Sequence, residues 1–328
     1  MKKKLAIIGA GNVACKSYLP FLSKREDLEL IIHSRTFDKA KRVAESFGAR
    51  AVETMEEVAA EQPISALVLT MEQQHLDAAN ALMELGLKRL FIEKPLNARN
   101  GQANVTEEDY FEAVRFVRRA KELGCELAMN FNYRFFELYK KLHAIISERQ
   151  YGELRQSSWL VNYACWSHCI DLLYFFGGRI RTVTALGEKR ENADLAGAFT
   201  MENGGTGTIL GTNETDFGMS LYYVTLHFDK AIVTFEDLDS ELKIYETGTQ
   251  YRESYRLFGN FSRWNQYTDS FAKSVNAYLE TVEKGEKPPV SGEDGLRELQ
   301  FEAALRRSAA YGCPVDFAAY AKRGETSD

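Results

Sequence analysis

Short apolar runs alternate with longer amphipathic stretches over the first 130 residues of the chain. The apolar runs predict buried strands at 5–8, 28–33, 66–70, 89–93 and 126–130. Helical spacing of apolar residues predicts helices between them, at 13–22, 38–47, 74–86 and 107–124. The strands do not alternate strictly between apolar and polar residues, which indicates a parallel sheet buried on both faces. We therefore expect a doubly wound α/β domain in this part of the chain.

The pattern changes after residue 130. A helix with an apolar stripe is expected over 131–149, and two amphipathic helices are expected over 267–284 and 292–311. Between these helices lie strand-like runs at 183–186, 196–201, 206–212, 220–228, 231–235 and 242–245. Their connections have the length and residue types of hairpin turns, which predicts a mostly antiparallel sheet. The fold class is thus α/β, with domains expected at 1–128 and 129–328.

One of these runs, 220–228, has apolar residues on both of its faces. Tyr222, Val224, Leu226 and Phe228 alternate along it with Leu221, Tyr223, Thr225 and His227. One face would pack on helices of the same chain and the other on a second copy. We therefore expect a homodimer or a homotetramer.

Composition narrows the class of protein further. The chain has 328 residues, of which 45% are hydrophobic and 27% charged, as in soluble globular proteins. A formal net charge of −6 argues against a nucleic-acid partner, which needs a basic surface. No apolar run approaches the roughly 18 residues that cross a bilayer, so no membrane partner is expected. The five cysteines form no Cys-x-x-Cys pair and are expected to be reduced thiols in a cytoplasmic protein.

A glycine-containing turn follows the first expected strand. Gly9, Gly11 and Ala14 have the spacing G-x-G-x-x-A between a strand and a helix. Gly9 permits the tight turn, Gly11 lets backbone N–H groups approach a pyrophosphate, and Ala14 lets the helix pack closely on the strand. This context predicts a Rossmann domain that binds a dinucleotide, with a nucleotide-free turn as the alternative. Further cofactor contacts are expected from Asn12, Val13, Thr70, Glu93 and Lys94.

The second strand ends without the acid that usually selects NAD(H). Such an acid lies about 20 residues past the glycines and accepts a hydrogen bond from the ribose 2′-hydroxyl. Ser34 takes this place and is followed by Arg35 and Thr36, which could pair with and hydrogen-bond to a 2′-phosphate. NADP(H) is therefore the preferred cofactor, with NAD(H) as the second choice. The alternative is that Arg35, Lys39 and Arg42 are only solvent-exposed residues at the start of the following helix.

Several short motifs together resemble one enzyme family. They are IIGAGNVA at 7–14, SRTFDKA at 34–40, FIEKPLNA at 91–98, NYRF at 132–135 and the closing stretch 291–317. In this order they are similar to the glucose-fructose oxidoreductase, inositol dehydrogenase and MocA-like (Gfo/Idh/MocA) family. The resemblance implies an NAD(P)-dependent oxidoreductase with a Rossmann domain followed by an α/β domain that holds a large open sheet. It also implies that Lys94 lies near the nicotinamide and the reacting oxygen, and that copies assemble sheet against sheet.

The stretch 161–171, VNYACWSHCID, matches only half of the catalytic pattern of that family. The resemblance gives His168 the place of the family's catalytic histidine, but Ala164 stands where the family has an aspartate. A zinc site built from Cys165, His168 and Cys169 lacks a fourth ligand, so no metal is expected. A buried structural histidine is the remaining alternative.

These residues lead to a functional hypothesis. The chain would move a hydride between NADP(H) and a carbonyl or hydroxyl carbon of a sugar, a cyclitol or a related polar small molecule. Lys94 would stabilise the developing alkoxide, and His168 would act as the acid–base group. The expected substrate contacts are Asn132, Tyr133, Tyr163 and Asp171. Tyr163 and Asp171 could compensate for the missing acid. Asp171 is more readily explained, however, as a cap or an ion-pair partner within the fold. The alternative, motivated by Ala164, is a non-catalytic protein that binds or senses NADP(H).

Overall fold

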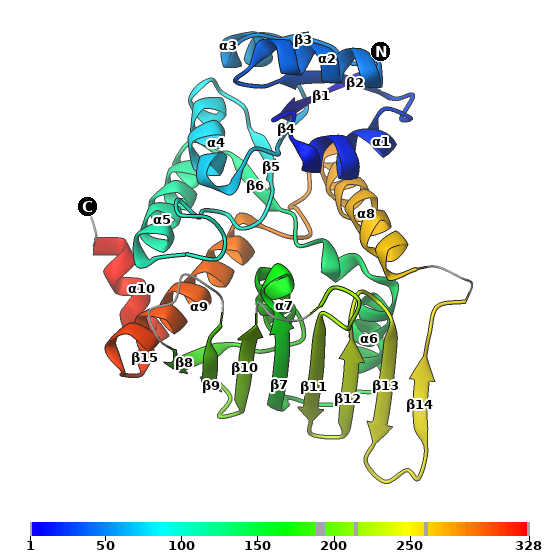
Figure 1. Cartoon of the computed structure of the whole chain (residues 1–328), viewed down its shortest axis with the longest axis vertical. Coiled ribbons are helices and arrows are strands. Elements are labelled where there is room, and N and C mark those ends of the chain that lie inside the picture. The colour runs from blue at the N-terminus through cyan, green and yellow to red at the C-terminus, as the bar shows by residue number, and fades with distance from the viewer. Residues whose placement is uncertain (1, 188–193, 213–215, 259–261, 327–328) are drawn as a thin grey trace. The chain divides into compact units, whose positions relative to one another are not determined.

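The computed structural model describes residues 2–187, 194–212, 216–258 and 262–326, and it divides into two compact units (Figure 1). Unit 1 consists of Met1–Gln102, Glu108–Asn130 and Phe271–Leu299, and unit 2 consists of Ala103–Glu107, Phe131–Ser270 and Gln300–Asp328. The segment Phe271–Leu299 therefore groups with the N-terminal residues. Its amphipathic pattern does not reveal this, because such a pattern shows that a helix packs on something but not on which sheet.

The sheet of unit 1 is parallel throughout. Its strands follow the order β3-β2-β1-β4-β5-β6, and every neighbouring pair is parallel. The strands are β1 (Lys3–Ile8), β2 (Leu28–His33), β3 (Arg50–Val52), β4 (Ser65–Val68), β5 (Arg89–Ile92) and β6 (Glu126–Met129). This confirms the predicted Rossmann-type sheet. Strand β3 was not predicted, because it has only the three residues Arg-Ala-Val and shows no recognisable period.

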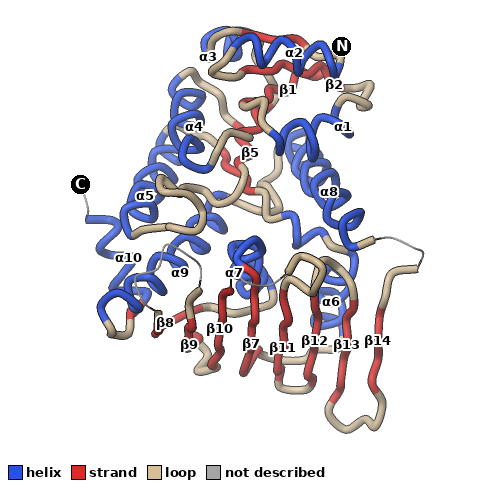
Figure 2. Tube along the Cα trace, in the orientation of Figure 1, coloured by secondary structure: helices blue, strands red, loops and turns tan. Residues whose placement is uncertain are grey.

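Helices cover both faces of this parallel sheet. They are α1 (Leu19–Leu22), which continues a π-helical turn at Ala14–Tyr18, α2 (Phe37–Phe47), α3 (Met55–Ala60), α4 (His75–Glu84), α5 (Glu107–Glu122) and the C-terminal part of α8 (Arg263–Lys284). Within unit 1, α4 and α5 lie on one side of the sheet and α1 and α8 on the other (Figure 2). Phe91 of β5 meets Tyr278 of α8 with ring centroids 5.2 Å apart. Burial on both faces explains why the strands are apolar without alternation.

The sheet of unit 2 is larger and mostly antiparallel. In the described part of the chain its strands follow the order β14-β13-β12-β11-β7-β10-β9-β8-β15, and only the β7–β10 pair is parallel. The strands are β7 (Leu154–Asn162), β8 (Ile180–Leu186), β9 (Ala196–Met201), β10 (Thr206–Thr212), β11 (Tyr222–Phe228), β12 (Ala231–Glu236), β13 (Glu241–Glu246), β14 (Arg252–Tyr255) and β15 (Val315–Asp316). The predicted large, mostly antiparallel sheet is confirmed.

Helices cover one face of this second sheet and leave the other open. The helices of unit 2 are α6 (Glu137–Glu148), α7 (Trp166–Phe175), the N-terminal part of α8, the C-terminal part of α9 (Gly292–Tyr311) and α10 (Phe317–Thr326). Phe301 of α9 packs edge-on against Phe199 of β9, with ring centroids 5.8 Å apart. Along β11 every second residue from Tyr222 to Phe228 is buried, whereas Tyr223 on the other face keeps 44% of its surface exposed. None of the helices described is long and apolar enough to cross a membrane.

Candidate active site

The glycine turn opens a cleft at the carboxyl end of the parallel strands. Gly9 has φ +110°, and a Cβ atom on it would lie 2.6 Å from the carbonyl oxygen of Leu69. A Cβ on Gly11 would meet no atom within 4 Å. Gly9 is therefore required by the packing of the turn on its neighbouring strand, and Gly11 leaves room for a ligand to approach the backbone. The cleft has a volume of about 760 Å³.

The residues expected to bind a cofactor mostly line this cleft. Its wall contains Gly9, Gly11, Asn12, Val13, Ser34, Arg35, Thr36, Lys39 and Thr70. Thr70 has a buried hydroxyl that makes no hydrogen bond to any described residue. A glycine cradle and an unused buried donor fit a pyrophosphate with its attached ribose, so the residues present suit a dinucleotide.

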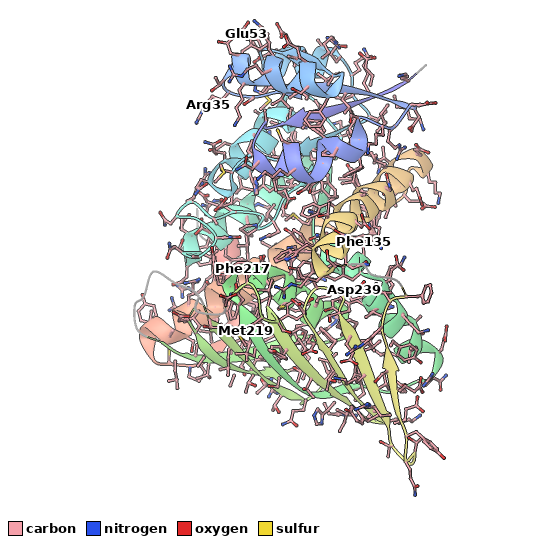
Figure 3. All side chains as sticks on the ribbon, turned by 45° about the vertical axis from the view of Figure 1, so that its right-hand side comes forward. Arg35, Glu53, Phe135, Phe217, Met219 and Asp239 are labelled. Atoms are coloured by element: carbon pink, nitrogen blue, oxygen red, sulfur yellow. The ribbon has the colours of Figure 1, made fainter. Side chains whose placement is uncertain are left out.

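The mouth of the cleft at the end of β2 is positively charged. Ser34 is half-buried, whereas Arg35, Thr36 and Lys39 are exposed and all line the cleft. Arg35 projects outward from the end of β2 (Figure 3). No acidic residue occupies position 34, and the one acid in the lining, Asp77, pairs with Arg99 at 2.8 Å. The cationic side chains can therefore act on an anionic group of a bound nucleotide.

A buried histidine that was not predicted as a site residue, His75, lies between the segments that follow β4 and β5. His75 is 1% exposed, and its Nδ1 and Nε2 atoms lie 2.8 Å from the Pro95 carbonyl oxygen and 3.1 Å from that of Thr70. Burial lowers the pKa of His75, which favours the neutral ring. A neutral imidazole donates only one hydrogen bond, so one carbonyl is bound strongly and the other is a polar neighbour.

Glu93 and Lys94 follow β5 but face different surroundings. The Glu93 carboxylate is 6% exposed and accepts hydrogen bonds from the Tyr18 hydroxyl and from Asn130 Nδ2, the latter at 2.9 Å. Glu93 also accepts from the Lys94 backbone N–H at 3.0 Å. These contacts place Glu93 in the interior of unit 1 rather than in the wall of the cleft. Lys94 is half-buried, and its Nζ atom donates to Oε1 of Gln102 at 3.1 Å.

In unit 2, His168 lies on a helix that is almost completely buried. The Asn162 side chain caps the turn before this helix by accepting from the Ala164 N–H at 2.9 Å. His168 is 2% exposed, and the ring of Tyr133 stacks on it at 4.0 Å with an interplanar angle of 12°. Burial raises the pKa of Tyr133 well above its usual value, with a further contribution from Cys165, whose Sγ lies 3.2 Å from the phenol oxygen. Tyr133 therefore stays a neutral phenol and fixes the plane of the imidazole.

The other expected substrate contacts differ in exposure. Asp171 is 1% exposed and pairs with Arg134 through two hydrogen bonds, at 2.8 Å to Nε and 2.5 Å to Nη2. Asn132 is fully buried and donates to Ser270 Oγ at 2.6 Å, while its Oδ1 has no hydrogen-bond partner among the described residues. Tyr163 is half-buried and is thus the most accessible of these residues. Asp171 acts within the fold, because both of its oxygens are engaged by the guanidinium group.

Metal ligation finds no support in the described residues, which contain no group of three or more His, Cys, Asp or Glu side chains able to hold an ion. Burial raises the pKa of Cys169 well above its usual value, so this thiol stays protonated. Cys165, whose Sγ contacts the Tyr133 hydroxyl, and Cys169 are both buried.

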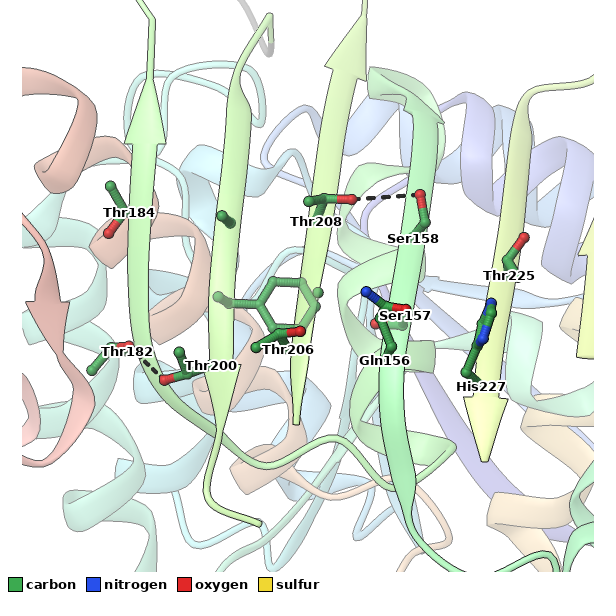
Figure 4. Close-up of a pocket in the computed structure, with 13 residues that line it drawn as sticks. Gln156, Ser157, Ser158, Thr182, Thr184, Thr200, Thr206, Thr208, Thr225 and His227 are labelled. Atoms are coloured by element: carbon green, nitrogen blue, oxygen red, sulfur yellow. Dashed lines mark hydrogen bonds between the residues drawn. The ribbon is translucent and has the colours of Figure 1, made fainter. Parts of the chain in front are cut away.

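A second hollow, of about 700 Å³, lies on the open face of the larger sheet (Figure 4). Hydroxyl side chains of β7, β8, β9 and β10 line it together with Thr225 and His227 of β11. Thr182 and Thr200 hydrogen-bond to each other across two strands at 2.6 Å. His227 is the one ionisable side chain among the lining residues, so this face offers hydrogen bonding but little acid–base chemistry.

Comparison with known proteins identifies relatives of both units. Residues 3–131 match the model of an oxidoreductase family with an NAD-binding Rossmann fold, GFO_IDH_MocA. The dTDP-3,4-didehydro-2,6-dideoxy-alpha-D-glucose 3-reductase of Actinomadura kijaniata is 22% identical, over 93% of this chain and 95% of that protein. The inositol 2-dehydrogenase of Rhizobium meliloti (strain 1021) is also 22% identical, over 94% of this chain and 98% of that protein.

A solved structure extends the likeness to the whole fold. An oxidoreductase from Agrobacterium radiobacter, in complex with NAD+, L-tartaric acid and magnesium, superposes with a TM-score of 0.81. It is 16% identical and covers 97% of this chain and 99% of that chain. At this level of identity the match establishes the shared fold alone.

Proposed function

We propose that the chain is a member of the oxidoreductase family whose NAD-binding Rossmann-fold model matches residues 3–131, and that it transfers a hydride between NADP(H) and a small polyhydroxylated molecule. The proposal rests above all on the glycine-lined cleft at the carboxyl end of the parallel strands. The names of two relatives, a deoxysugar reductase and an inositol dehydrogenase, support a sugar or a cyclitol as the substrate class.

Each polar side chain has a role in this proposal that follows from its chemistry. The bound nicotinamide supplies or accepts the hydride at the reacting carbon. In the direction of reduction, the Lys94 ammonium stabilises the negative charge that develops on the carbonyl oxygen. His168 delivers the proton that completes the hydroxyl group, and it removes that proton in the direction of oxidation. Tyr133 holds the imidazole plane, and the Arg134–Asp171 pair fixes the helix that carries it.

The preference for NADP(H) is the finer part of the proposal. Ser34 leaves room for a 2′-phosphate where an acid would repel it, and Arg35 and Lys39 bring two positive charges to the same wall of the cleft. Neither cation forms an ion pair with an acid in the described part of the chain within 4.0 Å. Their charge is therefore available to the nucleotide.

A direct assay tests the enzymatic proposal. Purified protein is incubated with NADPH and a panel of keto-sugars and inosose ketones, and with NADP+ and the corresponding alcohols, while absorbance of the reduced nicotinamide is followed. We expect turnover with at least one polyhydroxylated compound. Nucleotide binding without turnover on any compound of the panel would contradict the proposal.

A non-catalytic role is the second candidate, because Ala164 provides no acid beside His168. Ala164 is half-buried in the turn Tyr163–Cys165 that leads into α7. If the site is an attenuated catalyst, Ala164→Asp should increase the turnover number. If the site serves only for binding, this substitution should leave turnover absent, with nucleotide affinity unchanged.

The open face of the larger sheet supports a homo-oligomer. Tyr223, Leu160 and Leu210 lie on three adjacent strands and are 44%, 43% and 44% exposed, beside the hollow rich in hydroxyl groups. Large apolar side chains gathered on one exposed sheet face are typical of an interface between subunits. A second copy placed against this face would bury them.

A further inference from the structure

The connection that follows β5 begins with residues 93–102, which belong to unit 1 and are held in place by several contacts within it. Arg99 pairs with Asp77 at 2.8 Å and with Glu112 at 2.9 Å, and its backbone N–H donates to Asp109 Oδ1 at 2.7 Å. Asn97 is fully buried and donates to the Asp109 carbonyl oxygen at 3.1 Å. Long connections without their own helix or strand are often functional. These contacts give this one a defined path.

The path brings Gln102 back to the lysine at the start of the connection. Gly101 has φ +85°, a conformation that favours glycine, and its N–H donates to the Ala98 carbonyl oxygen at 3.0 Å. The Gln102 backbone N–H donates to Glu72 Oε1 at 3.3 Å. The Gln102 side chain then accepts from Lys94 Nζ at 3.1 Å. Both side chains are half-buried, so solvent screens this contact only in part.

We infer that Gln102 is a positioning residue for the Lys94 ammonium, an inference that rests on the role proposed for Lys94 in hydride transfer. An ammonium group has three N–H donors, and the amide oxygen uses one of them. The remaining two can reach a substrate oxygen. The amide carries no charge, so it orients the lysine without neutralising it. A carboxylate at the same place would form an ion pair and weaken the field that acts on the developing alkoxide.

The carboxylates of Glu93 and Glu72 accept hydrogen bonds from other groups, so the described acceptor for the Lys94 ammonium is Gln102. The Glu93 carboxylate is bound by Tyr18 and Asn130 and by the backbone of Lys94. The Glu72 carboxylate accepts from the backbone of Gln102. The side chain of Lys94 is thus held by a neutral acceptor.

Two variants separate orientation from charge. Gln102→Met keeps the length of the side chain but removes the acceptor, and Gln102→Glu keeps the shape but adds a negative charge. Asn100→Asp is the matched control, because Asn100 is an exposed residue of the same connection and receives the same charge. Thermal unfolding of each variant shows whether the fold is intact.

The first measurement needs neither cofactor nor substrate. Full-length protein is acylated at pH 8 with a trace of an N-hydroxysuccinimide ester of acetic acid, and the rate at Lys94 is read by peptide mass spectrometry relative to the other lysines. Gln102→Glu should slow acylation of Lys94 about tenfold, because a nearby carboxylate favours the unreactive ammonium. Gln102→Met should speed it at least about twofold, because Lys94 Nζ loses the acceptor that holds it and becomes more accessible to the ester. Asn100→Asp should match the wild type.

The second measurement uses NADPH with a compound that the wild-type protein turns over. Gln102→Met should lower kcat with little change in the KM for NADPH, and Gln102→Glu should lower it further and alter the pH profile. Equal acylation rates at Lys94 in all four proteins would overturn the inference, whatever the turnover. If the acylation rates change as expected but kcat does not, Gln102 contacts Lys94 without positioning it for catalysis. This outcome would also overturn the inference. If no compound is turned over by the wild type, the proposed function fails, while the acylation rates still decide whether Gln102 holds Lys94.

Discussion

The buried pair of Arg134 and Asp171 should be one of the strongest single contributors to the stability of unit 2. The two hydrogen bonds between the guanidinium and the carboxylate hold α7 against the segment that contains Tyr133, and the two side chains are 11% and 1% exposed. Removing one partner of a buried pair costs about 3–5 kcal/mol, because the other charge is left uncompensated. In Asp171→Asn the amide can still accept one hydrogen bond and Arg134 retains some contact with water. We therefore expect a loss of about 2–4 kcal/mol.

Intrinsic fluorescence can follow this loss in unit 2 without interference from unit 1. The chain contains three tryptophans, Trp159, Trp166 and Trp264, and all of them lie in unit 2. Trp159 and Trp166 are 1% and 3% exposed, so their emission should shift strongly when this unit unfolds. Urea denaturation of the full chain, followed by tryptophan emission, therefore gives the free energy of unfolding of the unit that contains the pair.

Two further variants make the measurement decisive. Asp229→Asn removes a carboxylate from an ion pair with Arg155 whose side chains are 49% and 38% exposed, so its effect should be much smaller. The double variant Arg134→Met with Asp171→Leu removes both charges together and should recover at least about half of the loss seen for Asp171→Asn. The reasoning is refuted if Asp171→Asn shifts the midpoint no more than Asp229→Asn does. A double variant less stable than the single one would show that the pair is net stabilising.

Five other outcomes are expected. Arg35→Ala should weaken NADPH binding about tenfold, or about 1.4 kcal/mol, and leave NADH binding nearly unchanged in fluorescence titrations; equal losses would contradict a 2′-phosphate contact. Lys94→Ala should lower kcat far more than it weakens NADPH binding, and His168→Ala should remove about 10²–10⁴ in rate and flatten one limb of the pH profile. His75 has a lowered pKa, so its contribution to stability is complete above the unfolded value of about 6.5 and is lost as pH falls below it; His75→Gln should reduce this loss in hydrogen exchange of β4 and β5. Sedimentation at micromolar concentration should give a mass above the 37.2 kDa of one chain, and a monomer mass would refute assembly through the open sheet.

The parallel sheet could be predicted because its residues have one dominant environment. Strands such as β1 and β4 are buried on both faces, so nearly every residue is apolar and the run stands out from its neighbours. Strand β7 was missed although it lies between β10 and β11 in the second sheet. Its buried residues Leu154, Trp159 and Val161 do not follow a clear period of two, because the exposed Arg155 and Gln156 are adjacent and the exposed Leu160 is itself apolar. A strand that packs on one face only has a mixed sequence, so it is harder to recognise than a strand buried on both faces.

Some residues of the candidate site could be predicted from local sequence, whereas others depend on contacts between distant segments. The glycine turn and the residues after β2 could be assigned to a nucleotide cleft because their roles depend on backbone geometry within one strand–turn–helix unit. The partners of Asp171, Glu93 and Lys94 lie 37, 37 and 8 positions away in the chain, on segments whose approach no periodicity encodes. Residue type alone made Asp171 a candidate for substrate and for internal pairing alike, and only the position of Arg134 distinguishes the two. Side chains that act through a distant partner therefore become visible only in the folded chain.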